Sequence, residues 1–290
     1  MKRISKPQKG EAGINMWLIL NVGIIALIVS SCATPPPIRQ TAAPRALAAL
    51  SCGEGQRIVI AVSPVESPDV AGIFKRSWSS YLSDFGLVGK VISTAHSPID
   101  DLTPEFKKAI GAVLGPVDLQ QQLLAQAEQV IKPRTSCETV FLPTTWEKPA
   151  VFRPSDRVVV MSFYFIFTRG RPTIMGYLNA TVMTGKNAAE LAKRADELGK
   201  IMEEMKKLEP YVRVTDKQRP DLGKLKQYAA LSQKLGDGLT PYIDGVGTVN
   251  YTSPGHSTDE WLANGGAVMT QELAAIMDRL IGDVAGILFN

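Results

Sequence analysis

The stretch Trp17 to Cys32 decides in which compartment the rest of this chain folds, and therefore which of its cysteines can oxidise. Four basic residues and one acidic residue precede it, and a proline-rich segment follows it. A positively charged flank, a short apolar run and small residues near its end form the layout of a secretory signal. The apolar run, Trp17 to Val29, counts 13 residues, whereas a helix that crosses a bilayer needs about 20. We therefore predict that residues 1–31 are a cleaved signal peptide.

The last four residues of this stretch, Val29-Ser30-Ser31-Cys32, resemble the lipobox of bacterial lipoproteins. The resemblance implies that the signal is cut before Cys32 and that this cysteine carries the lipid, including palmitate. Valine replaces the commoner leucine and serine the commoner glycine or alanine, and both are close in size. Ala33 follows, and in proteobacterial lipoproteins a residue other than aspartate there generally implies export. The implied location is the outer membrane, with the protein lipid-anchored and facing the periplasm.

Two alternatives to a cleaved signal stay open at this point. In the first, Trp17 to Val29 remains in the inner membrane as an uncleaved anchor, although its length and Asn21 weigh against a stable span. In the second, the same run is a buried helix of a cytosolic protein, which would not need the four bases before it.

The net charge of +4 is concentrated in the predicted leader, which contributes +3 and leaves about +1 for residues 32–290. Binding of DNA or RNA depends on clustered bases that neutralise phosphates, so we expect no nucleic-acid partner. Residues 32–52 are rich in alanine and proline, and we predict that they form a tether. Residues 53–290 have the length and apolar content of a globular domain, and we predict that they form a single periplasmic α/β domain.

The chain contains three cysteines. If Cys32 carries a lipid, Cys52 and Cys137 remain as a pair in an oxidising space, and we predict that they form a disulfide. Closing a loop of about 85 residues would stabilise the fold by about 4 kcal/mol in the chain-entropy model. Two separate buried thiols are the alternative. The two histidines, His96 and His256, offer no metal-ligand spacing with these cysteines, so we expect no metal site.

The pattern of apolar residues predicts an α/β fold, with a mixed sheet covered by amphipathic helices. Arg57 to Ser63 is apolar on both faces, as expected of a central strand. Ser67 to Gly86 has helical spacing, and Val88 to Thr94 is predicted to be a second strand. Two long strands, Arg157 to Thr168 and Thr173 to Thr184, are predicted to form a hairpin, with the first in the middle of the sheet. Further strands are predicted at Glu138–Leu142 and Val246–Thr252, and further helices after Thr103, Asp118 and Ser257.

The segment 187–235 is predicted to be a helical hairpin that projects from the sheet. Asn187 to Leu208 begins with a capping box and carries an apolar stripe at alternating spacings of three and four. Pro210 to Pro220 breaks the pattern. Asp221 to Leu235 then carries a shorter stripe, which consists of Leu222, Leu225, Ala229 and Leu235. Because the heptad spacing is brief, packing within the chain is favoured over a coiled coil.

We find no motif for catalysis in the sequence. A phosphate-binding loop, a dinucleotide fingerprint, a nucleophile elbow and a zinc-protease helix are all missing. His256 to Glu260 gathers a base, two hydroxyls and two acids, but the start of a helix explains this string better. We therefore expect a protein without enzymatic activity and without a cofactor.

Two pairs of residues are candidates for a surface that binds a partner. Arg169 and Arg171 at the tip of the predicted strand hairpin could meet lipid phosphate or an acidic partner, although bases at a tip more often keep it solvated. Met202 and Met205 on the helical stripe could form an adaptable binding surface. Core packing is the alternative for these methionines.

The strand-helix-strand pattern from Arg57 to Thr94, RIVIAVSPVESPDVAGIFKRSWSSYLSDFGLVGKVIST, resembles the opening of the periplasmic domains of curli-secretion-type envelope-assembly lipoproteins. The auxiliary lipoproteins of lipid-trafficking ABC transporters have a similar order. The resemblance covers about 40 residues and a C-terminal helix. It implies a binding or assembly component of a cell-envelope complex, whose partners are the membrane and other envelope proteins.

The alternative function is a periplasmic carrier of a lipid or other apolar ligand. A cell-wall hydrolase is a third possibility, which the missing catalytic set disfavours. An apolar cavity would support the carrier, whereas a filled core with an exposed apolar patch would support partner binding. The residues expected to line such a cavity are Trp78, Tyr81, Phe163 and Phe165.

Overall fold

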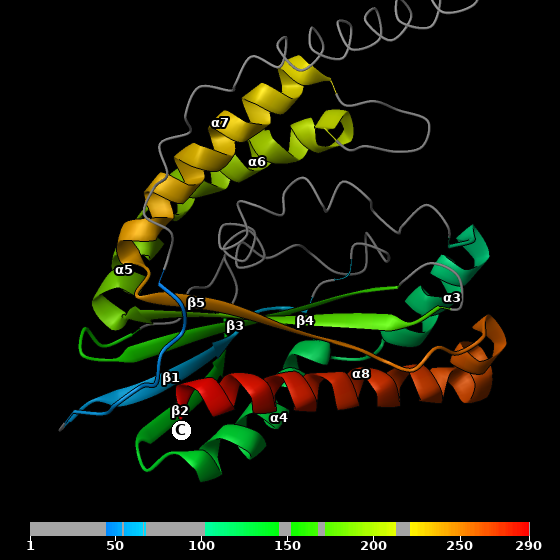
Figure 1. The fold of residues 1–290 in the computed structure, drawn as a ribbon, viewed down its shortest axis with the longest axis horizontal. Coiled ribbons are helices and arrows are strands. Elements are labelled where there is room, and N and C mark those ends of the chain that lie inside the picture. Colours follow the sequence, from blue (N-terminus) through cyan, green and yellow to red (C-terminus); the bar gives the residue numbers. More distant parts are fainter. Residues whose placement is uncertain are drawn as a thin grey trace, which may run out of the picture. The chain divides into compact units, whose positions relative to one another are not determined.

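The strands described in the computed structural model form one mixed sheet, in the order β2-β1-β3-β4-β5 (Figure 1). The structure describes residues 45–53, 55–65, 67, 102–144, 152–167, 172–212 and 221–289, all of which fall within one unit, Thr41–Asn290. The strands are β1 (Arg57–Val62), β2 (Glu138–Pro143), β3 (Arg157–Phe167), β4 (Ile174–Thr184) and β5 (Gly245–Thr252). The predicted α/β fold with a mixed sheet is therefore confirmed.

The sheet combines parallel and antiparallel pairing. β1 lies between β2 and β3 and is parallel to both. β3 and β4 pair antiparallel along their whole length, from Arg157 opposite Thr184 to Phe167 opposite Ile174. This is the predicted strand hairpin, and β3 is the central strand as expected. β5 completes the sheet antiparallel to β4.

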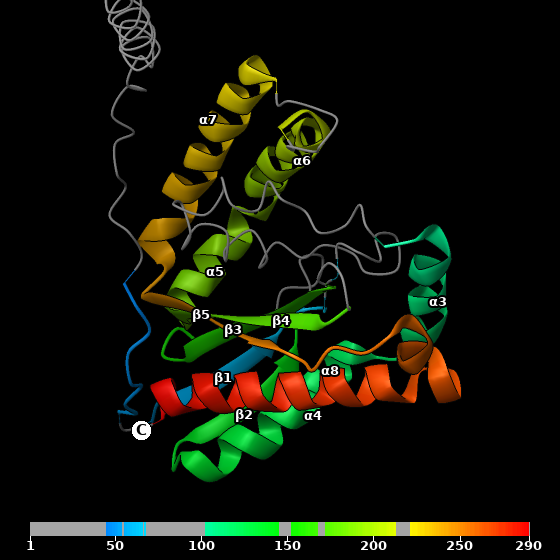
Figure 2. The same ribbon diagram turned by 45° about the vertical axis from the view of Figure 1, so that its right-hand side comes forward.

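Three helices cover one face of the sheet: α3 (Pro104–Leu114), α4 (Leu119–Ile131) and α8 (Thr258–Leu288), as Figures 1 and 2 show. Thr103 and Asp118 cap the first two as predicted. The long strand β3 supplies Phe163, Phe165 and Phe167 to this core, where Phe167 meets Trp261 edge to face at 6.1 Å. Burial of these aromatic side chains, together with the more numerous aliphatic ones around them, stabilises this face.

The helix α8 packs on β4 at a glycine and bends at a pair of glycines. A Cβ added at Gly176 would lie 2.4 Å from Ile276, so only glycine permits this close approach. The capping box of Ser257 and Glu260 is present as predicted. The helix is then interrupted from Ala263 to Gly266, where Gly266 takes a φ of +83° against Val113.

The opposite face of the sheet carries α5 (Gly185–Lys193), α6 (Ala195–Val212) and α7 (Leu222–Leu239), followed by the short 3₁₀ turn η4 (Thr240–Tyr242). Helices α6 and α7 pack against each other as the predicted hairpin, and the end where they are joined points away from the sheet in both views (Figures 1 and 2). Another 3₁₀ turn, η3 (Lys132–Arg134), follows α4 on the face of the sheet that α3, α4 and α8 cover.

The predicted boundaries of the hairpin need correction. The first helix starts two residues earlier, because the Thr184 hydroxyl accepts from the Asn187 amide and is the true cap. It also breaks at Arg194, whose φ of −94° and ψ of 4° are not helical, so one predicted helix is two. Finally, α6 continues through Pro210 to Val212, although a proline inside a helix removes one intrahelical hydrogen bond and crowds the preceding turn.

Residues 45–52, which were predicted to be part of a tether spanning residues 32–52, include segments attached to the domain. Ala46 pairs with Val246 of β5, and the Leu50 amide donates to the Leu288 carbonyl at 2.8 Å. Gly247 makes room for this segment, since a Cβ there would lie 2.7 Å from Leu47. The leucines of this stretch bury apolar surface and hold it on the domain. Residues 32–44 lie outside the described residues.

Some predicted elements fall outside the part of the chain that the structure describes. These are the helix from Ser67 to Gly86, of which only Ser67 is described, and the strand from Val88 to Thr94. In the described ranges, no helix is both long and apolar enough to cross a membrane.

A buried ion pair joins β1 to the start of β3. The Arg57 guanidinium donates to both carboxylate oxygens of Asp156, at 2.8 and 3.0 Å, and the Asp156 side chain is fully buried. The same carboxylate accepts from the Arg153 amide, and the Asp156 carbonyl accepts from the Gly185 amide at the start of α5. Burial alone would raise the pKa of Asp156, but the hydrogen bonds from Arg57 and Arg153 hold it below its ordinary value.

We expect Asp156→Asn to lower the free energy of unfolding by about 3 kcal/mol at neutral pH, because it leaves Arg57 without its partner. The folded carboxylate binds a proton less readily than the unfolded one, whose pKa is about 3.9. The stabilisation is therefore complete above about pH 4 and is lost as the pH falls toward the lowered pKa. Urea titrations of both proteins at neutral pH and near pH 3 would measure the difference.

Asp244→Asn is the matched control for this prediction. Asp244 also pairs with an arginine, Arg157, at 3.1 Å, but its side chain is 40% exposed. An exposed pair contributes at most about 1 kcal/mol, so this variant should stay close to the natural protein. Equal losses in the two variants, or a difference that does not narrow in acid, would contradict the role given to Asp156.

Candidate functional site

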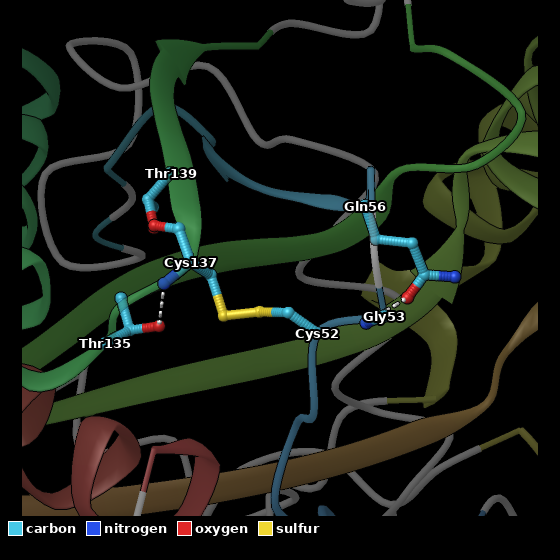
Figure 3. The surroundings of a disulfide bond; sticks show 6 residues. All are labelled: Cys52, Gly53, Gln56, Thr135, Cys137 and Thr139. Atoms are coloured by element: carbon cyan, nitrogen blue, oxygen red, sulfur yellow. Dashed lines mark hydrogen bonds between the residues drawn. A yellow bond between two sulfur atoms is a disulfide. The ribbon is translucent and has the colours of Figure 1, made fainter.

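A disulfide links Cys52 and Cys137, as predicted from the sequence (Figure 3). Their Cα atoms lie 6.1 Å apart, within the range that a disulfide can bridge. Cys137 directly precedes β2, and Cys52 lies five residues ahead of β1. Because β1 and β2 are parallel, the chain enters both strands at the same edge of the sheet, and this places the two cysteines together.

Local hydrogen bonds fix the backbone on both sides of the disulfide (Figure 3). The Cys137 amide donates to the Thr135 hydroxyl at 3.1 Å, and the Thr139 hydroxyl donates to the Cys137 carbonyl at 3.0 Å. On the other side, the Gly53 amide donates to the Gln56 side-chain carbonyl at 3.1 Å. The disulfide is thus part of an ordered junction between the N-terminal segment and the sheet.

The other predicted site residues have different outcomes. Cys32, Arg169 and Arg171 lie outside the described residues. Met205 is 3% exposed in the core beneath α6 and α7, and Met202 packs against the same core. This placement agrees with the alternative prediction for the two methionines, which is core packing. They therefore stabilise the hairpin by packing inside it.

Of the four residues expected to line an apolar cavity, Phe163 and Phe165 are described. Both are fully buried, and their rings stack with centroids 6.1 Å apart in the core covered by α8. Trp78 and Tyr81 lie outside the described residues. The described pair therefore belongs to the apolar core that α8 covers.

On the face of the sheet that carries α5, α6 and α7, the part along β4 and β5 has polar side chains where the rest of that face has an apolar core. The Tyr177 ring stacks on Tyr164 with centroids 4.5 Å apart, and burial raises the pKa of Tyr177. The Asn179 side-chain carbonyl accepts from the Thr248 hydroxyl at 2.7 Å, while its buried amide nitrogen has no partner among the described residues. With its pKa raised, the Tyr177 hydroxyl stays protonated at neutral pH.

The described residues do not assemble a reactive group of side chains. His256 lies 3.6 Å from Glu272 and packs its ring against Trp261, while Ser257 and Glu260 cap α8. These contacts agree with the interpretation of this string as a helix start. In the described ranges, no three His, Cys, Asp or Glu side chains are grouped so that they could hold a metal ion.

A group of exposed apolar residues at the joined end of the helical hairpin was not predicted from the sequence. Tyr211 is 48% exposed, Leu222 70% and Leu225 37%. Leu222 and Leu225 were expected on the packed stripe of α7, and this expectation is wrong because α6 and α7 bury that stripe only near the sheet. One feature of the sequence could have indicated this exposure: Leu222 and Leu225 have lysines close by, at positions 224 and 226.

Comparison with families, with characterised proteins and with solved structures finds no match to this chain. Its function therefore has to be argued from its own residues.

We expect peptide mapping of the protein without reduction to find Cys52 linked to Cys137. Replacing both by serine should lower the free energy of unfolding by up to about 4 kcal/mol, since the bond closes a long loop in the unfolded chain. Denaturant titration of the natural and double-serine proteins would measure this. Alkylation of both thiols in unreduced protein would refute the pairing.

Proposed function

We propose that this chain is a lipid-anchored protein of a bacterial envelope that binds other envelope components and catalyses no reaction. The observation that carries the proposal is the pairing of the cysteines. With Cys52 bonded to Cys137, Cys32 is left over of the three in the sequence. It stands at the end of the apolar run, at the position where a lipobox cysteine receives its lipid.

The disulfide also supports an exported location. Such bonds persist in oxidising compartments, which include the bacterial periplasm, and are rare in the cytosol. Residue Ala33 favours the outer membrane by the same lipobox resemblance. The proposed protein is therefore held at the periplasmic side of the outer membrane by the lipid on Cys32.

The described structure favours partner binding over a carrier function. Phe163 and Phe165 are packed in the core that α8 covers, and apolar side chains are exposed at the hairpin end. An exposed apolar patch is typical of a surface that contacts a protein or a membrane, and this supports binding at the surface of the domain. The absence of catalytic motifs from the sequence supports a role without catalysis.

The short attachment limits how far the domain stands from its anchor. Residues 33–44 lie between the proposed lipid and the first described contact, and twelve residues span at most about 40 Å when fully extended. The domain would therefore work close to the membrane that holds it.

We expect Cys32→Ala to abolish metabolic labelling with palmitate and to leave the precursor unprocessed. Gel analysis of labelled cells expressing the natural and variant chains would measure both effects. The Cys52→Ser, Cys137→Ser double variant is the control, because it removes two cysteines but should keep the label. Continued labelling of the Cys32 variant would contradict the proposed anchor, and cross-linking in native envelopes would identify the partners.

A further inference from the structure

The joined end of the helical hairpin combines exposed apolar side chains with basic ones. The backbone amide of Asp221 donates to the Tyr211 carbonyl at 2.9 Å, which holds the end of α6 beside the start of α7. The hairpin tip is defined here by its described residues. They are Lys206, Lys207, Tyr211, Leu222, Lys224, Leu225 and Lys226.

Exposure along α7 changes steadily toward this tip. Leu239 and Leu235 are buried, Leu231 is half-buried, and Leu225 and Leu222 are exposed. A single exposed leucine is common on protein surfaces. Here, however, three of the four large exposed apolar side chains of the described ranges gather at one place, and the fourth, Ile287, is on α8.

Among the described side chains near this apolar group, basic ones outnumber acidic ones. Lys206, Lys207 and Lys226 are exposed, and the Lys224 ammonium lies 5.8 Å from the centre of the Tyr211 ring. The carboxylate of Asp221 accepts from the amides of Gly223 and Lys224 as the cap of α7. The tip therefore presents ammonium groups around a leucine and tyrosine centre.

We propose that the hairpin tip binds the surface of a bilayer that contains anionic phospholipids. Its leucines and the Tyr211 ring enter the headgroup region, where the amphipathic tyrosine is favoured. The lysines extend their charged ends to the lipid phosphates. This contact is separate from the lipid on Cys32 and does not depend on the proposed function.

The shape of the tip favours a lipid surface over a protein partner. A specific protein interface covers about 800 Å² on each side. The tip is the protruding end of two helices and offers three apolar side chains. A fluid bilayer can close around such a projection, while a protein would need a groove made to fit it.

The test measures which lysines a bilayer protects. The full chain is mixed with vesicles of phosphatidylcholine alone or with added phosphatidylglycerol, and the protein that floats with the vesicles is treated with an amine-reactive reagent. Mass spectrometry then gives the labelling of each lysine relative to the free chain. Lys108 on α3 and Lys234 near the other end of α7 are both exposed and serve as internal references.

With phosphatidylglycerol present, we expect labelling of the four tip lysines to fall about fivefold while the two references stay unchanged, and high salt should reverse the protection. The double variant Leu222→Asp, Leu225→Asp should lose the protection. Ile287→Asp is its matched control, because it places the same charge at the fourth exposed apolar residue, and it should keep the protection.

Three results would overturn the proposal. The first is equal labelling of tip and reference lysines on anionic vesicles, or failure of the chain to float with them. The second is equal protection on phosphatidylcholine alone. The third is protection of the tip without vesicles that grows with protein concentration, which would assign this surface to a second copy of the chain. Palmitate labelling through Cys32 is measured separately, so either proposal can fail alone.

Discussion

The parallel pairing of β1 with both β2 and β3 is the constraint on which the rest of this structure depends. Parallel neighbours cannot be joined by a tight turn, so long connections must bring them together. Two interactions secure the ends where the chain enters these strands: the Cys52–Cys137 disulfide links the approaches to β1 and β2, and the Arg57–Asp156 ion pair links β1 to β3. The backbone carbonyl of Asp156 also accepts from the first residue of α5, so the same residue positions the start of the helical layer.

Much of the fold could be predicted from the sequence because its local signals agree with its packing. The length of β3, with apolar residues on both faces, indicated a strand covered on each side, and the structure confirms its central position. Caps at Thr103, Asp118 and Ser257 marked helix starts correctly. The disulfide could be predicted by counting cysteines, on the expectation that the chain folds in an oxidising compartment.

The remaining features could not be predicted because they depend on contacts between distant segments. Leu47 looked like part of an alanine-rich tether, and its attachment depends on the absence of a side chain at Gly247, two hundred residues later. Leu222 and Leu235 belong to the same apolar stripe, yet the first is exposed and the second buried. Their difference arises from how far α6 and α7 extend beyond the sheet, which periodicity does not report.

The attachment of residues 45–50 also determines how this domain would carry mechanical load. A pull on the chain ahead of Arg45 would first separate Ala46 from β5 and then Leu50 from the end of α8. Releasing residues 45–51 would lengthen the connection by at most about 25 Å. At Cys52 the force would then pass through the covalent bond to Cys137, and part of it would enter the sheet at β2. Under load, the N-terminal segment would therefore extend by this short length and no further. The disulfide would then keep β1 from being drawn out of the sheet.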